Sequence, residues 1–310
     1  MGPWFDLLLV ANVAWPLLLL AQWREGFDGR AGVQFWQLYF VTTPHRWITL
    51  FIVFLDRERF AARRQTFLAV AAVAVAFCLG VRMTTGTLTC LLALDYVWNG
   101  WHFAAQHHGI YRIYGRLSMA ADTTGRTLEK WLMRGFLMYV ILRVAGVTWA
   151  APRLEQGLAN LDWVVLSIPA WLICRNLIQR PRALGQLSYL ASVTTLYLSL
   201  LWAVHSGRPR LVLVLATAAA LFHAVEYLSV VAWSVRQRHA KAANRMGLLG
   251  YLVPRWGIAL AVFVVVLGAG GWLMDQHWVE TWLLLNVVAA FMHYAYDGLI
   301  WRKPAAATGA

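Results

Sequence analysis

The sequence predicts an all-α, polytopic integral membrane protein with about ten transmembrane helices. Of its 310 residues, 60% are hydrophobic and only 13% are charged, whereas soluble domains carry roughly 25% charged residues. The apolar residues recur in runs of ~20, long enough to cross a bilayer as a helix. Many of the Trp residues stand at the ends of these runs, where their rings favour the headgroup layer. Together these observations exclude a water-soluble globular fold.

Ten apolar runs bounded by charged residues, Gly or Pro define the expected spans. The first has no preceding basic segment and no small-residue cleavage site, so we expect it to be retained and not removed as a signal peptide. We expect one transmembrane domain over residues 1–303 and a disordered tail at 304–310. The expected spans are 3–23, 33–55, 65–81, 87–112, 131–149, 162–178, 187–204, 211–235, 255–274 and 281–301.

Local features modify individual spans. Pro44 lies midway along the span 33–55, which predicts a kink that frees backbone carbonyls. At Gly109 the span 87–112 is expected to loosen. The spans 131–149 and 162–178 contain basic side chains that must extend to the membrane surface, namely Arg134, Arg143 and Arg175.

The distribution of Lys and Arg orients the chain. Nineteen of the 27 fall in alternate loops, seven fall in the other loops, and Arg46 lies within a span. Because cytoplasmic loops carry the excess of Lys and Arg, we expect both termini in the cytoplasm and the chain in the cell membrane, as in a bacterial inner membrane. The net charge of +13 therefore has a topological explanation, and we expect no nucleic-acid binding.

Polar residues inside the spans are few, and each is costly to insert. In the span 33–55, His45 and Arg46 directly follow Pro44. The span 87–112 carries a polar stripe, because residues at intervals of four, three and four lie within about 60° of one another on a helix. The stripe consists of Asp95, Asn99, His102 and Gln106, and His107 and His108 follow it.

Two further spans each carry a histidine and a carboxylate on one helical face. His223 and Glu226 are three residues apart, and His293 and Asp297 are four apart. Either pair has the spacing to ligate one metal ion. The charge distribution predicts that these two spans run in the same direction as 33–55 and 87–112, which brings one histidine of each span to the same depth within about 5 Å. These histidines are His45, His102, His223 and His293.

Imidazole and carboxylate ligands suit Fe, Zn or Mn, and the absence of clustered Cys argues against a soft copper site. The candidates outnumber the four ligands of a tetrahedral zinc, which favours two metals or one metal with many supporting groups. We expect Asp95 and Asn99 either to support His102 or to form an interhelical hydrogen bond, and Gln106 belongs to the same stripe. Arg46 is expected to form an ion pair with Asp95 or Asp297. We expect His205, His239 and His277 to lie solvated in loops. The candidate ligands are His45, His102, His107, His108, His223, Glu226, His293 and Asp297.

The run His102-Phe103-Ala104-Ala105-Gln106-His107-His108 resembles the histidine boxes of membrane fatty-acid desaturases, hydroxylases and alkane monooxygenases. Those families use several such boxes to bind two irons, whereas this chain has one. The Pro44-His45 step and the spacing from His293 to Asp297 are similar to features of membrane carotene-cleaving oxygenases of the Brp/Blh type, which are all-helical and of comparable length. These resemblances imply a non-haem iron centre.

We therefore expect a mononuclear or di-iron oxidoreductase that uses O2 on a lipophilic substrate such as a lipid, alkane, carotenoid or quinone, with membrane lipids around it and an electron-donor protein as partner. Glu226 and Asp297 would be ligands or proton-transfer groups, and His107 or His108 would complete a second metal site or accept protons. Three alternatives stay open at this point. They are a zinc intramembrane hydrolase with Glu226 or Asp297 as base, a haem protein for electron or quinone chemistry, and a cation or proton transporter.

Overall fold

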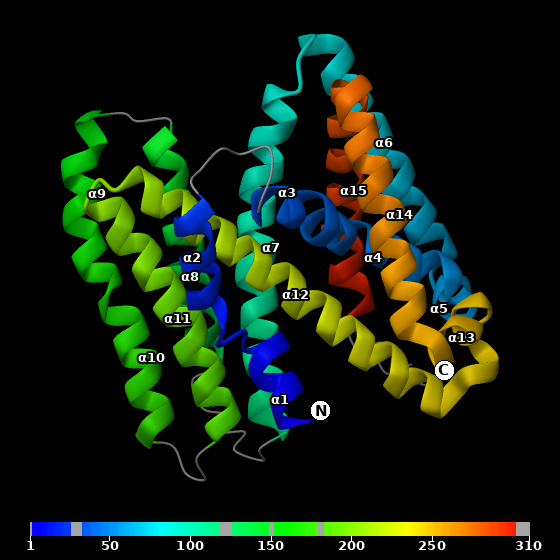
Figure 1. The fold of residues 1–310 in the computed structure, drawn as a ribbon, viewed down its shortest axis with the longest axis horizontal. Helices are drawn as coiled ribbons and strands as arrows, with labels where there is room; N and C mark the ends of the chain where they lie inside the picture. The colour runs from blue at the N-terminus through cyan, green and yellow to red at the C-terminus, as the bar shows by residue number, and fades with distance from the viewer. Residues whose placement is uncertain (1, 26–32, 118–125, 149–151, 179–182, 302–310) are drawn as a thin grey trace, which may run out of the picture. The chain divides into compact units, whose positions relative to one another are not determined.

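The computed structural model describes residues 2–25, 33–117, 126–148, 152–178 and 183–301. Within these ranges all regular structure is helical (Figure 1), which confirms the all-α class. Seven helical segments of the described chain are long and apolar enough to cross a membrane, fewer than the ten expected spans. These segments are Val33–Leu55, Arg64–Thr85, Gln156–Ile178, Leu184–His205, Pro209–Arg245, Leu248–His277 and Val279–Ile300.

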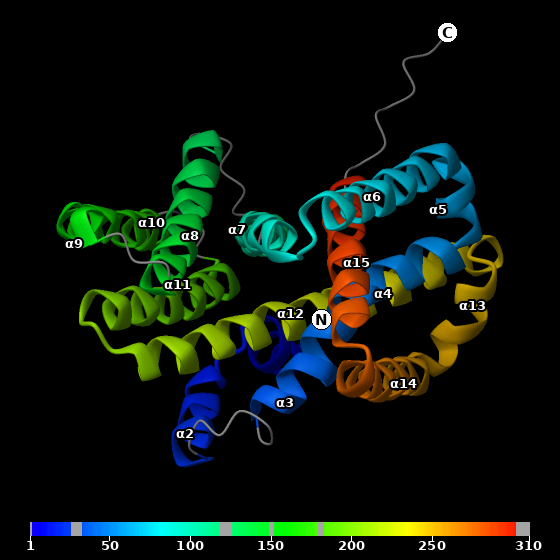
Figure 2. The same ribbon diagram turned by 90° about the horizontal axis from the view of Figure 1, so that it is seen from above.

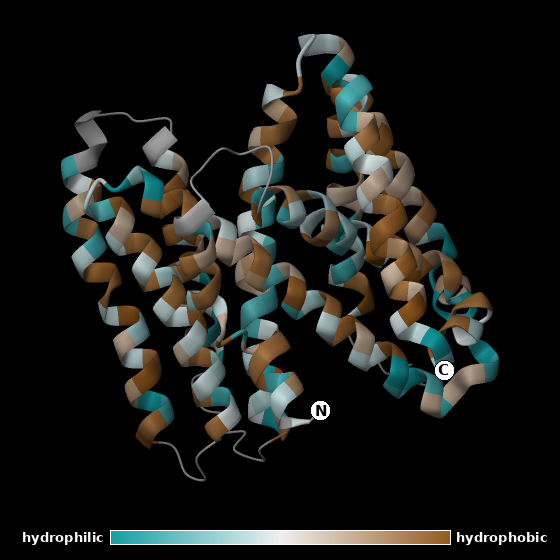
Figure 3. Ribbon diagram, viewed as in Figure 1, coloured by the Kyte–Doolittle hydropathy of each residue, from teal (hydrophilic) through white to brown (hydrophobic). Residues whose placement is uncertain are grey.

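One of these helices exposes a succession of large apolar side chains, as a lipid-facing surface requires. Helix α14 (Trp256–His277) is coloured as hydrophobic along most of its length in Figure 3. Its residues Ile258, Val262 and Val266 are 66%, 56% and 66% exposed. Large apolar groups exposed in succession mark a surface that contacts lipid or protein and not water, which is consistent with a helical membrane protein.

The chain forms two compact units. Unit 1 comprises residues 1–34 and 100–229, and unit 2 comprises 35–99 and 230–310. Helices α7 (Thr89–Leu117) and α12 (Pro209–Ala242) contribute residues to both units. The expectation of one domain over 1–303 stays a prediction, and the expected tail at 304–310 lies outside the described residues.

In unit 1, four helices lie side by side and contact one another (Figures 1 and 2). Helix α7 packs closely on this group at Gly100, where an added Cβ atom would lie 3.0 Å from Cγ2 of Ile141 and 3.2 Å from Sδ of Met138. The N-terminal segments α1 (Pro3–Phe5), η1 (Asp6–Val10) and α2 (Trp15–Glu25) belong to the same unit. The four helices are α8 (Arg126–Thr148), α9 (Pro152–Val165), α10 (Ser167–Ile178) and α11 (Leu184–His205).

The prediction of a single helical span over 3–23 is wrong. The chain turns at Asn12, whose φ of 45° lies in the left-handed region, a conformation that Asn tolerates better than most residues. The Asn12 amide donates to the carbonyl oxygens of Leu9 and Phe222, so its side chain stabilises the break. One polar residue in an apolar run thus divides the run into short helices.

Two further spans show how continuous their helices are. The expected span 162–178 lies within Gln156–Ile178, which is long and apolar enough to cross a membrane, and a short turn separates α9 from α10, where Ser167 Oγ donates to the carbonyl of Val164. Pro169 follows in the first turn of α10, where its missing N–H is tolerated. Conversely, α7 continues as an α-helix through Gly109 to Leu117, so the expected loosening at Gly109 does not occur.

In unit 2, α15 (Val279–Ile300) packs against three helices, α4 (Thr43–Leu55), α6 (Arg64–Thr85) and α14 (Figure 2). Buried apolar side chains of α4, α6, α7 and α15 form its core. The connecting segments are α3 (Val33–Gln37), η2 (Leu38–Thr42), α5 (Arg57–Ala62), η3 (Ala243–Arg245), α13 (Leu248–Leu252) and η4 (Val253–Arg255).

The predicted disturbance at Pro44 is present as a π-helical turn. The segment η2 directly precedes α4, and Pro44 occupies the first turn of α4. Proline has no N–H to donate to the preceding turn, and single π-turns inside helices are frequent at functional sites. This irregular turn directly precedes the first turn of α4, which contains His45.

Candidate metal-binding histidine groups

A buried polar group in unit 1 contains four of the predicted ligands. Helix α7 supplies His102 and His107, and α12 supplies His223 and Glu226. All four are buried, and His107 and Glu226 have no exposed surface. Tyr189 of α11, also inaccessible, completes what we call the His107 group.

His107, Glu226 and Tyr189 form a closed triangle of short contacts. The Nδ1 atom of His107 lies 3.0 Å from Oε2 of Glu226 and 2.9 Å from the Tyr189 hydroxyl. The same hydroxyl donates to Oε1 of Glu226 over 2.7 Å. Because the tyrosine proton goes to the carboxylate, the ring proton of His107 belongs on Nδ1, facing Glu226 and Tyr189. The Nε2 atom of His107 is then an acceptor.

That Nε2 atom is buried and has no hydrogen-bond partner among the described residues. A ligand histidine that donates its other N–H to a carboxylate is the usual arrangement in metal sites, since the carboxylate fixes the tautomer and makes the free nitrogen more basic. The orphaned nitrogen of His107 therefore fits a metal ion.

The ring spacings in the group also fit a shared ion. The rings of His102 and His223 are 5.0 Å apart between centroids and nearly perpendicular, and those of His107 and His223 are 6.0 Å apart. With a metal–nitrogen distance of about 2.0–2.1 Å, two imidazoles on one tetrahedral ion have centroids about 5 Å apart. The ring of His223 is held in place by Phe103, which stacks on it at 3.6 Å.

The structure shows the contacts of two predicted residues in this group. Glu226 was expected to share a metal with His223 on its own helix, which stays a prediction, and its carboxylate contacts His107 and Tyr189 of two other helices. Gln106 donates to the backbone carbonyl of His223 over 3.0 Å and so contacts the α12 backbone. The helical periodicity predicted which face of its own helix each residue occupies, but it did not identify the residues of other helices that each one contacts.

Unit 2 contains a second buried group, which we call the His293 group. His45 and Thr49 come from α4, and His293 and Asp297 come from α15. The rings of His45 and His293 are 4.7 Å apart between centroids and nearly perpendicular, again the spacing that one shared ion imposes. Both histidines are at most 2% exposed.

Thr49 connects the histidine and the carboxylate of this group. Its hydroxyl lies 2.6 Å from Nδ1 of His293 and donates to Oδ1 of Asp297 over 3.3 Å, whereas His293 and Asp297 are themselves 4.0 Å apart. Since the hydroxyl proton goes to Asp297, the hydroxyl oxygen accepts the Nδ1 proton of His293, which leaves Nε2 as an acceptor. Thr49 was not predicted, although it follows His45 by four residues and so lies on the same helical face.

Arg46 and Asp95 form the ion pair that the sequence predicted, with 3.3 Å between Nη2 and Oδ2. Tyr294 donates to the other carboxylate oxygen over 2.8 Å. Of the two roles considered for Asp95, these contacts match the interhelical one. Asn99, the next residue of the stripe, has a buried Oδ1 atom with no hydrogen-bond partner in the described part of the chain.

His108 has different surroundings from its neighbour His107. Its ring is 6.4 Å from that of Tyr111 and lies in the field of Arg134, Arg112 and Lys130. Of the two adjacent histidines, His107 is the one that contacts Glu226.

His205, His239 and His277 were expected to lie solvated in loops, and the loop placement is wrong, although His205 and His277 are exposed. His239 lies within α12, and His277 is the last residue of α14, because both helices extend beyond their apolar runs. His205 ends α11, and its Nδ1 atom lies 3.0 Å from Oδ2 of Asp162.

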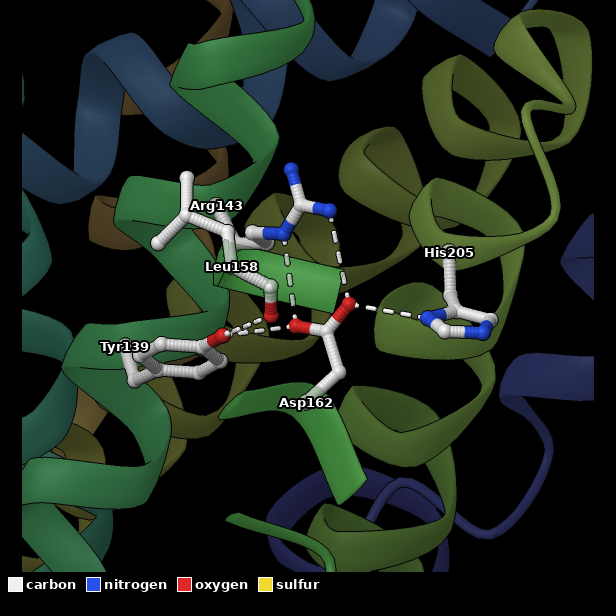
Figure 4. Close-up of polar contacts among 5 residues, drawn as sticks. All are labelled: Tyr139, Arg143, Leu158, Asp162 and His205. Carbon is white, nitrogen blue, oxygen red and sulfur yellow. Dashed lines mark hydrogen bonds and ion pairs between the residues drawn. The ribbon is translucent and has the colours of Figure 1, made fainter. Parts of the chain in front are cut away.

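Asp162 is the centre of a polar cluster that joins α8, α9 and α11 (Figure 4). Its carboxylate is 3% exposed and accepts hydrogen bonds from Arg143, over 3.3 and 3.4 Å, and from the Tyr139 hydroxyl over 2.6 Å. With His205 it contacts three side chains on two other helices. The snorkelling expected of Arg143 is therefore replaced by a buried ion pair, and the cluster holds the helices together.

Comparison of the chain with protein-family models, with curated proteins and with solved structures gives no match.

Proposed function

We propose that the protein is a membrane-embedded, metal-dependent oxidoreductase that uses O2 on a lipophilic substrate at a non-haem iron centre. The observation that carries the proposal is the unpartnered Nε2 atom of His107, whose Nδ1 faces the buried carboxylate of Glu226. A nitrogen oriented in this way suits iron, zinc or manganese. Bound iron would supply the one-electron chemistry that O2 requires, with an electron-donor protein as the source of reducing equivalents.

The residues of the two groups would have distinct tasks. His102, His107 and His223 in unit 1, and His45 and His293 in unit 2, would donate ring nitrogens to metal. Glu226 would hold the proton on Nδ1 of His107, and Asp297 would do so for His293 through the Thr49 hydroxyl. Both carboxylates are then positioning groups, and Tyr189 is the nearest proton donor to Glu226.

The surroundings favour an apolar substrate. The His107 group is lined by Phe103, Phe222 and Tyr197, whose rings lie 3.6 to 5.8 Å from histidine rings of the group. An environment of this kind excludes water, which suits a substrate that partitions into the bilayer. Lipids, alkanes, carotenoids and quinones share this property.

Metal analysis and a visible spectrum of the full chain, purified in detergent from cells, test the proposal. We expect iron at about one or two ions per chain and no Soret band. A colourless zinc protein would instead favour a hydrolase, and a Soret band would favour a haem protein. Either result overturns the non-haem iron assignment.

Single variants then test the ligands. We expect His107→Ala, His223→Ala and His293→Ala each to lose at least half of the bound metal, because each removes a ring nitrogen from a group of two or three. His277→Ala is the matched control, since His277 is exposed. If His223→Ala and His293→Ala both retain their full metal content, the groups are not metal sites.

A further inference from the structure

Unit 2 contains an ion pair within its apolar helices that the proposed function does not use. Nη2 of Arg46 on α4 lies 3.3 Å from Oδ2 of Asp95 on α7, and Tyr294 of α15 donates to Oδ1 of Asp95 over 2.8 Å. Arg46 follows His45 in the sequence and Tyr294 follows His293, so the pair involves the same two helices as the His293 group, on an adjacent face. Charged groups inside a span are costly and mark functional sites.

The guanidinium group of Arg46 has more donors than the ion pair uses. It carries five N–H groups, and Asp95 is the acceptor that it contacts among the described residues. Asp95 itself is fully engaged, because Arg46 and Tyr294 each contact one of its two oxygens. The side chain of Arg46 is 23% exposed, so a molecule from outside the core can reach it. Arg46 can therefore donate to a ligand without leaving Asp95.

Asn99 supplies an acceptor one helical turn beyond Asp95. The two residues are four apart on α7 and so lie on one face, with about 5–6 Å between their Cβ atoms. The Oδ1 atom of Asn99 is buried and has no hydrogen-bond partner in the described part of the chain. Leaving a buried acceptor unpaired is unfavourable. One ligand oxygen at about 3 Å from each of two groups spans about 6 Å, which is enough to contact both Asn99 and the guanidinium group beside Asp95.

A row of aromatic rings adjoins the ion pair. The ring centroid of Trp98 lies 5.5 Å from that of Tyr294 and 5.3 Å from that of Phe291, and Phe291 lies 6.2 Å from Phe77. Trp98 and Phe77 are 41% and 44% exposed, whereas Tyr294 and Phe291 are buried. The row therefore extends from the tyrosine that contacts Asp95 to the apolar surface of unit 2. It offers a hydrocarbon chain a large apolar contact area beside the polar groups.

We propose that Arg46, Asn99 and Trp98 form a binding site for a lipophilic alcohol. The hydroxyl oxygen accepts from Arg46, the hydroxyl proton is donated to Oδ1 of Asn99, and the hydrocarbon chain lies along the aromatic row. The pair of Arg46 and Asp95 is electrically neutral, so a carboxylate or phosphate would add a buried charge without a counterion. A hydroxyl both donates and accepts, whereas a carbonyl only accepts and an alkane does neither.

This inference deepens the proposed function, on which it rests for the conclusion that the bound alcohol is the substrate. It selects hydroxylated lipophilic molecules from the broader set of apolar substrates and excludes plain alkanes. Binding itself requires no metal, because the three residues of the site are not among the proposed ligands.

Equilibrium binding of radiolabelled probes to the full chain in neutral detergent tests the site. The probes are 1-dodecanol, 2-dodecanone and dodecane, which share a chain length and differ in their polar group. We expect saturable binding of 1-dodecanol, binding of 2-dodecanone that is about tenfold weaker, and no saturable binding of dodecane. Equal binding of the three probes, or no saturable binding of 1-dodecanol, overturns the proposal.

The same measurement on chelator-treated protein separates this inference from the proposed function. We expect 1-dodecanol to bind equally well with and without metal. Binding to a protein that proves to contain no iron would support the alcohol site while the iron assignment fails. An iron protein that does not bind 1-dodecanol would show the opposite.

Variants test the two hydrogen bonds. Asn99→Ala removes the acceptor and keeps the ion pair, so we expect it to weaken 1-dodecanol binding about tenfold and to leave 2-dodecanone binding unchanged. Asn244→Ala is the matched control, since Asn244 is exposed on η3, and it should bind both probes like the wild type. Arg46→Lys keeps the charge beside Asp95 but has three donors in place of five, so it should weaken the binding of both probes.

The thermal unfolding midpoint of each variant without ligand checks that it folds. Because Asn99→Ala leaves the ion pair intact, it tests the site even if Arg46→Lys does not fold. A folded Asn99→Ala protein that still prefers 1-dodecanol to 2-dodecanone as the wild type does, or an equal loss in Asn244→Ala, would show that Asn99 does not bind the hydroxyl group.

Discussion

The Nδ1 atom of His107 lies 3.0 Å from Oε2 of Glu226, and neither side chain has any exposed surface. The two residues come from different helices, α7 and α12. A carboxylate that is buried without a cation must be stabilised by hydrogen bonds, and the Tyr189 hydroxyl donates one to Oε1 of Glu226. The contact between His107 and Glu226 fixes the histidine tautomer, and its removal gives the most direct test of the proposed metal chemistry.

We expect Glu226→Gln to lower metal affinity by about 10–100-fold, the usual effect of losing a carboxylate behind a ligand histidine. The amide is nearly isosteric but carries no charge, and it no longer forces the proton onto Nδ1 of His107. Competition with a chelator, followed by metal analysis, measures the change. Glu280→Gln is the control, since Glu280 is 55% exposed and pairs with Arg82. Equal affinities in the wild type and Glu226→Gln would contradict the positioning role.

The second prediction concerns Thr49, whose hydroxyl connects His293 to Asp297. Thr49→Val keeps the shape of the side chain but leaves two buried polar groups without this partner, so we expect a loss of about 1–3 kcal/mol in the free energy of unfolding together with weaker metal binding. Thr49→Ser restores the hydroxyl and should recover both properties. Denaturant unfolding in detergent and metal analysis are the measurements.

Thr217→Val is the matched control for Thr49→Val. The Thr217 hydroxyl donates to the carbonyl of Leu213 on its own helix, a bond whose net contribution is about 1 kcal/mol or less. A metal content that falls equally in both variants would show that the Thr49 effect is not specific to the His293 group.

The sequence predicted helix faces well and helix neighbours poorly. The spacing of His293 and Asp297 predicted that they share a face, and they do. The same reasoning paired Glu226 with His223, because a helical period compares residues of one helix only. Which other helix a face meets depends on packing, so neither the contact of Glu226 with His107 nor the participation of Tyr189 followed from the sequence.

The prediction of helix boundaries was limited for a similar reason, because an apolar run was treated as one unit. Hydropathy averaged over the run 3–23 does not register Asn12, whose left-handed backbone ends a helix. It also ended the spans 211–235 and 255–274 too early, because polar residues continue α12 and α14 beyond their apolar runs. Apolar composition identified regions that lie in helices, and single residues decided where those helices break.

The third prediction concerns the cluster around Asp162. Asp162→Ala would leave Arg143, whose side chain is 7% exposed, buried without its carboxylate. Breaking a buried ion pair costs about 3–5 kcal/mol, so we expect a clearly lower thermal unfolding midpoint. Glu280→Ala removes an exposed pair and should cost about 0–1 kcal/mol. Both variants should keep their metal content, and a loss of metal in Asp162→Ala at a temperature where it stays folded would link this cluster to the histidine groups.

The last prediction uses two adjacent glycines of α14. A Cβ atom at Gly271 would clash with the indole ring of Trp282 on α15, whereas nothing lies within 4 Å of one at Gly270. Overpacking of a buried contact costs about 1–3 kcal/mol, but alanine is a better helix former than glycine by about 1 kcal/mol. We therefore expect Gly271→Ala to lower the unfolding free energy and Gly270→Ala to leave it unchanged or raise it. If both substitutions shift stability in the same direction by the same amount, α14 and α15 are not in close contact at this position.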